Sequence, residues 1–134
     1  MTHQYSVAVR NAALDARETA IGTGAILKLF SGAEPANCAA ADPSGLLATL
    51  TLPTDWMAAA SGGVKAKAGV WTGTGSGAGT VASYRIYDSG LAACHVQGTV
   101  TATGGGGDMT VDNAVIASSQ TITVNTYQWT AGNP

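Results

Sequence analysis

Two neighbouring residues, Cys94 and His95, carry side chains that elsewhere serve as a nucleophile and its base. The stretch around them alternates as a strand does, so their side chains are expected on opposite faces and cannot readily hydrogen-bond each other. Cys38 would add a third candidate zinc ligand, but the three lack the paired spacing of zinc sites. The sequence therefore favours His95 as a strand residue and predicts no metal here.

The eight carboxylates are scattered, and most lie where turns are expected. Asp108, Asp112 and Asn113 offer oxygens that a calcium ion could accept, but turn formation is the simpler interpretation. No two carboxylates can be chosen as an acid and a base for a glycan-acting enzyme. We therefore expect a protein that is not an enzyme and needs no cofactor.

A glycine-rich run, GTGSGAG at 73–79, resembles a phosphate-binding loop in composition. Such a loop must open a helix, whereas this run precedes a strand pattern and lacks a following Lys-Ser or Lys-Thr pair. Nucleotide binding is therefore not expected. Six aromatic residues could line a sugar-binding face, but alternating aromatics in strands are more often core: Trp56, Trp71, Tyr84, Tyr87, Tyr127 and Trp129.

The glycine-rich run lies inside the stretch with the clearest strand pattern, Val64 to Tyr87. Side chains alternate between two faces before the glycines and again after them. Two such runs joined by a loop predict a β-hairpin. One face would lie on a core, and the other would carry half of the six basic residues, Lys65, Lys67 and Arg85.

One helix is predicted, from Tyr5 to Ile21, with Ser6 or Thr2 as its N-terminal cap and Gly22 at its end. Small and aliphatic residues recur at helical spacing along neighbouring stripes of its surface. The pattern leaves two interpretations open. The helix packs either on its own sheet or on a neighbouring subunit.

Short strand patterns recur at intervals of about ten residues through the rest of the chain. They predict a mainly β protein, an antiparallel β-sandwich or barrel-like domain of about eight strands with one N-terminal α-helix. Residues 1–22 form the helical docking element, and 23–134 form a single β domain. The long loop from Ser31 to Gly45, which contains Pro35 and Pro43, is a candidate interaction element.

Composition narrows the function further. Only 10% of the residues are charged and the net charge is −2, so no basic footprint for nucleic acid is present. No apolar stretch is long enough for a membrane span, and no signal peptide is recognisable. A surface poor in charge suits a subunit of a homo-oligomeric assembly. The two cysteines are interpreted as small half-buried residues whose thiols stay reduced in a cytoplasm. If paired, they would stabilise the fold by roughly 4 kcal/mol.

Several segments together resemble a family of small virion proteins of tailed bacteriophages and prophages: SVAVRNAALDARETAIG, LKLFSGAEPANCAAADPSGLLATLTLP, DWMAAASGGVKAKAGVW, YRIYDS, HVQGTVT and GGDMTVDN. The resemblance implies a structural component of the particle, made in the bacterial host cytoplasm and located in the virion. Capsid decoration on the major capsid protein is favoured. The alternative is a place among tail proteins, at the tail tip or a fibre attachment, in contact with a host-surface glycan.

Contacts with the particle are predicted for the helix and the long loop. Small residues on the helix let a partner backbone approach, larger ones act as anchors, and two prolines lower the cost of ordering the loop. The predicted interaction residues are Val9, Ala13, Leu14, Ala16, Ala20, Ile21, Pro35 and Pro43.

Overall fold

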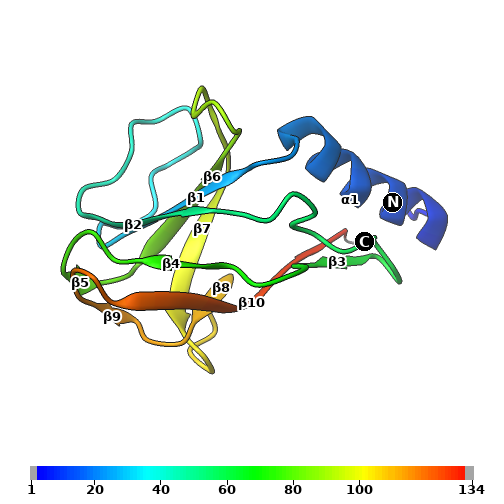
Figure 1. The fold of residues 1–134 in the computed structure, drawn as a ribbon. Coiled ribbons are helices and arrows are strands. Elements are labelled where there is room, and N and C mark those ends of the chain that lie inside the picture. Colours follow the sequence, from blue (N-terminus) through cyan, green and yellow to red (C-terminus); the bar gives the residue numbers. More distant parts are fainter. Residues whose placement is uncertain (1–2, 132–134) are drawn as a thin grey trace.

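The computed structural model describes residues 3–131 and forms a curled β-sheet with one helix at its side (Figure 1). The helix is α1 (Val7–Ile21), and the strands are β1 (Ile26–Phe30), β2 (Leu46–Thr51), β3 (Val64–Ala66), β4 (Thr72–Thr74), β5 (Gly79–Thr80), β6 (Ser83–Tyr87), β7 (Cys94–Ala102), β8 (Met109–Val111), β9 (Val115–Ile116) and β10 (Thr121–Thr130). Within residues 3–131, no helix combines the length and apolarity needed to cross a membrane.

Eight strands form the main sheet, in the order β2-β1-β6-β7-β8-β10-β3 with β4 also paired to β10, while β5 and β9 form a small second sheet. Neighbouring strands are antiparallel except β7 and β8, which run parallel. The two sides of the curled sheet meet where the Ser76 N–H donates to the Leu47 carbonyl at 2.8 Å. The predicted barrel-like β domain with one helix is therefore confirmed.

The predicted hairpin within 64–87 is wrong, because β3 pairs with β10 whereas β6 lies between β1 and β7. The glycine-rich segment between them crosses the closing seam of the sheet. A Cβ at Gly75 would lie 2.4 Å from the Ala117 carbonyl oxygen, and one at Gly77 would lie 2.7 Å from that of Leu46. The glycines therefore serve close backbone packing, since any larger residue would collide there.

The interior holds five contacting aromatic residues. The rings of Trp56 and Trp129 meet edge to face at 5.6 Å, and those of Tyr84 and Tyr127 at 5.3 Å. Trp71 contacts both groups. The Trp129 indole donates to the Tyr127 hydroxyl at 2.6 Å, which lies 2.8 Å from that of Tyr84. Burial chiefly raises the pKa of Tyr127 to about 12, so this hydroxyl stays protonated.

The helix α1 packs on its own domain. Ser6 caps its first turn, because the Ser6 hydroxyl accepts from the Val9 N–H at 3.2 Å. At the C-terminal end of the helix, the Gly22 N–H donates to the backbone carbonyl of Glu18. Leu14 and Ile21 point into the core, with exposed fractions of 0% and 7%. Of the two interpretations left open by the sequence, packing on the protein's own sheet is confirmed. Leu14 and Ile21 belong to the same buried cluster as the strand residues, so the helix contributes to the core.

Polar contacts also hold the helix to the domain. Lys65, on β3, is only 2% exposed, and its Nζ lies 2.6 Å from Asp15 and 2.9 Å from Glu18. The same two carboxylates accept backbone N–H groups from Ala60 and Met57. Burial opposes the charge on Lys65, but the hydrogen bonds with Asp15 and Glu18 outweigh it and raise the pKa of Lys65. Lys65 pairs in register with the core residue Trp129, so its side chain lies on the same face of the sheet as the core. The prediction that it lies opposite the core is wrong, and α1 covers it.

Replacing Leu14 by Ala tests the role of the helix in the core. We expect the free energy of unfolding to fall by about 3 kcal/mol, because the cavity left behind is closed on all sides. Urea denaturation measures this, and Val9→Ala on the exposed side of α1 is the matched control, with an expected change within about 0.5 kcal/mol. Equal effects of the two variants would contradict the packing of α1 on the domain.

Acid should weaken the attachment of the helix. The hydrogen bond from Lys65, followed by that from the Ala60 N–H, holds the pKa of Asp15 below 3.8. A carboxylate with a lowered folded-state pKa stabilises the fold above its unfolded pKa, and this contribution disappears as pH falls through the folded-state pKa. The loss of Tm caused by Asp15→Asn should therefore shrink below about pH 4. Thermal scans measure this; a pH-independent loss would contradict it, and Asp55→Asn controls for removal of one charge.

Candidate functional site

A stripe of small residues runs along the outer side of α1. Val9, Ala13, Ala16 and Ala20 recur every three or four residues, and all four side chains are exposed. They lie on the side of the helix opposite the attachment to the domain, so the stripe remains uncovered. Val9 is 52% exposed, and Val7 near the start of the helix is 49% exposed. We call Val9, Ala13, Ala16 and Ala20 the outer stripe.

A groove of about 280 Å³ borders the outer stripe, where α1 passes the end of β10. The Nε of Arg10 donates to the Ala131 carbonyl at 2.9 Å and so joins the two walls. The lining combines apolar and cationic side chains: Tyr5, Val9, Arg10, Ala13, Arg17 and Ala131. Such a surface suits an apolar segment that carries carboxylates.

The eight predicted interaction residues occupy three places. Val9, Ala13, Ala16 and Ala20 form the outer stripe, whereas Leu14 and Ile21 are core residues and cannot contact a partner. Pro35 and Pro43 are half-buried in the loop 31–45. This loop and α1 lie at opposite ends of the domain, so they do not make one continuous surface (Figure 1).

The loop 31–45 is held against the outer face of the sheet by one buried cation. Arg85, on β6, is 2% exposed. One of its terminal nitrogens donates to the Ala40 carbonyl at 2.9 Å and to Asp42 at 3.0 Å. The other donates to the Asn37 carbonyl at 3.1 Å and to the side chain of Gln97 at 3.0 Å. A single guanidinium therefore fastens the loop at three of its residues.

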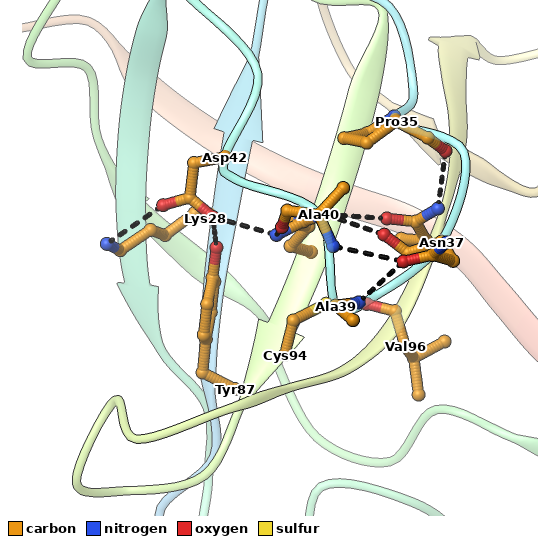
Figure 2. Close-up of polar contacts among 11 residues, drawn as sticks. Lys28, Pro35, Asn37, Ala39, Ala40, Asp42, Tyr87, Cys94 and Val96 are labelled. Carbon is orange, nitrogen blue, oxygen red and sulfur yellow. Dashed lines mark hydrogen bonds and ion pairs between the residues drawn. The ribbon is translucent and has the colours of Figure 1, made fainter.

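The neighbours of Arg85 complete the attachment, as Figure 2 shows around Asp42. Asp42 also accepts from the Tyr87 hydroxyl and lies 3.9 Å from the Nζ of Lys28. Gln97 donates to the Pro35 carbonyl at 2.7 Å. Burial, followed by the hydrogen bond to Asp42, raises the pKa of Tyr87, so the phenol stays a donor. Because Lys28, Arg85 and Gln97 lie in register across β1, β6 and β7, these strands present one polar row to the loop.

A cavity of about 590 Å³ remains between the loop and the strands. Its lining includes the two half-buried free cysteines, Cys38 from the loop and Cys94 from β7. Sequence reasoning interpreted these cysteines as separate residues and did not anticipate Arg85 as the attachment point. The available signal was an arginine between aromatic residues in a strand, which is costly to bury unless acceptors surround it.

The other residues considered for chemistry have structural contacts. His95 is exposed and lies 3.2 Å from Asp88. The Ala92 N–H and then His95 hold the pKa of Asp88 below its usual range. Asp108 accepts from the backbone and hydroxyl of Thr99, and Asp112 accepts from two backbone N–H groups. Within residues 3–131, no three His, Cys, Asp or Glu side chains are grouped to hold a metal ion.

Replacing Arg85 by Met tests the attachment of the loop. We expect the free energy of unfolding to fall by about 2–4 kcal/mol, because buried acceptors lose their donor. Hydrogen exchange should accelerate at residues 37–42 and remain unchanged in α1. The control is Lys67→Met, at a basic residue whose Nζ donates to the Gly69 carbonyl in an exposed contact and lies 6.0 Å from the centre of the Trp71 ring. Uniform acceleration across the chain would contradict a local role.

In comparisons with known proteins, no protein-family model, curated protein or solved structure matches this chain.

Proposed function

We propose that this protein is a non-enzymatic structural subunit of a tailed-bacteriophage virion, seated in many copies on the capsid shell as a decoration protein. The observation that carries the proposal is the outer stripe of α1. It stays uncovered although Leu14 and the ion pairs of Lys65 hold the opposite side of the helix to the domain. The resemblance of the sequence to small virion proteins supports the class of particle.

The outer stripe has the properties of a preorganised docking surface. Alanine side chains lose almost no conformational entropy when a partner covers them, and their size lets another backbone approach closely. The helix is already held by contacts on its inner side, so docking does not have to order it. Exposed apolar residues gathered on one element also mark interaction sites more often than scattered ones do.

The surface chemistry fits a crowded, repetitive setting. With only 10% of its residues charged and a net charge of −2, neighbouring copies repel each other weakly. The groove beside the stripe adds Arg10 and Arg17 to an apolar lining. The partner we propose is therefore a segment of the major capsid protein that presents an apolar ridge with carboxylates beside it.

Quantitative mass spectrometry of purified particles tests the role and the placement. Particles should be collected from a host that produces the virion encoding this chain. Hundreds of copies per particle support capsid decoration, whereas a ring of about three, six or twelve copies supports the alternative tail placement. Absence from the particle overturns the virion role.

Charge inserted into the outer stripe should prevent incorporation into particles. We expect Ala13→Glu and Ala16→Glu to fold with unchanged Tm and to enter particles at least about tenfold less than the unaltered chain, because each buries a carboxylate in the contact. Ala8→Glu, exposed on the same helix roughly a quarter turn outside the stripe, is the control and should enter normally. Normal incorporation of both stripe variants would sink the docking proposal.

Deleting residues 1–21 cannot replace these variants. The deletion removes Leu14 and Ile21 from the core and leaves the buried Lys65 without either carboxylate. A truncated chain that fails to join particles would therefore report loss of folding and not loss of docking.

A further inference from the structure

We propose that Cys38 and Cys94 form a modification site, at which a low-molecular-weight disulfide oxidant generates one intramolecular disulfide that fastens the loop 31–45 to β7. This site lies between the loop 31–45 and the start of β7, and it does not depend on the proposed virion role.

The fold brings the two thiols together from distant parts of the sequence. Both are free and half-buried, and both line the 590 Å³ cavity. The Sγ of Cys94 also donates to the Val96 carbonyl at 3.4 Å, a contact that oxidation must release. The cavity opens a path by which a small oxidant reaches both sulfurs.

The backbone on each side of the pair is held to the same strand. Cys38 lies between Asn37 and Ala40, whose carbonyls both accept from Arg85 on β6. Cys94 begins β7 and pairs with Tyr87, two residues further along β6. Figure 2 shows Cys94 next to Ala39 of the loop, in agreement with their place in one cavity. The folded protein therefore holds the thiols near each other before any bond forms.

The reaction is a pair of thiol–disulfide exchanges with oxidised glutathione as the co-reactant. The Cys38 thiolate attacks one glutathione sulfur and releases one glutathione thiolate. Cys94 then gives up its proton and attacks the Cys38 sulfur, which releases the second glutathione. Two protein thiols are oxidised while one glutathione disulfide is reduced to two thiols. Burial, followed by the hydrogen bond with Cys38, raises the pKa of Cys94 to about 12, which makes Cys38 the first nucleophile.

The test uses the folded full-length chain in mixtures of reduced and oxidised glutathione, quenched with acid. Intact mass should show the loss of two hydrogens, and trypsin should yield the peptides 29–65 and 86–134 joined by a reducible bond. The equilibrium constant for closure should exceed that of the same chain in concentrated urea by at least about a hundredfold, because folding positions the thiols. The oxidised protein should also unfold at a Tm higher by about 5 °C or more.

Cys38→Ser and Cys94→Ser are the matched controls, and neither should lose two hydrogens or gain Tm on oxidation. Three results would overturn the proposal. They are glutathione adducts without closure, disulfide-linked dimers as the main product, and equal closure in the folded and urea-unfolded chain.

Discussion

Two buried cations of the main sheet determine which segments cover it. Lys65 and Arg85 are each 2% exposed. Lys65 lies on the same face of the sheet as Trp129, and Arg85 lies on the face opposite Tyr84 and Ile86. Burying a charge without partners costs several kcal/mol, so each must be surrounded by acceptors. The carboxylates of α1 surround Lys65, and Asp42 with the carbonyls of the loop 31–45 surrounds Arg85. Detachment of α1 or of the loop 31–45 would therefore leave Lys65 or Arg85 without its acceptors.

The two attachments divide the molecule into ends with different properties. At one end α1 is held from its inner side, which leaves Ala13 and its neighbours in the outer stripe as a rigid exposed surface. At the other end the loop lies on β1, β6 and β7, and an open cavity lined by both cysteines remains beneath it. A contact with a particle at the first end and a disulfide at the second can therefore form independently.

The aromatic interior of the sheet also contacts the end of α1. The five aromatic rings fill the centre of the curled sheet, and their polar groups have partners: the Trp56 indole donates to the Gly22 carbonyl at 3.1 Å, just beyond α1. The helix end is thus tied to the interior as well as to Lys65. Because α1 supplies core residues, loss of the Lys65 attachment is expected to lower the stability of the whole domain and not of one segment alone.

The sequence by itself determined the local structure and the direction of side chains. Ser6 and Gly22 marked the ends of α1, and strand alternation set Arg85 opposite the core. Strand alternation predicts which face of the sheet a side chain occupies, but it does not predict which segment packs on that face.

Only the tertiary structure decided the contacts between distant segments. It paired β3 with β10 in place of a hairpin with β6, turned Leu14 into the core, placed Arg85 beneath the loop, and put Cys38 and Cys94 in the lining of one cavity. Each of these joins residues far apart in the chain, and such pairings depend on how the whole sheet curls and closes. Local propensity carries no information about that closure, because every strand of similar pattern is an equally acceptable neighbour until the sheet is assembled.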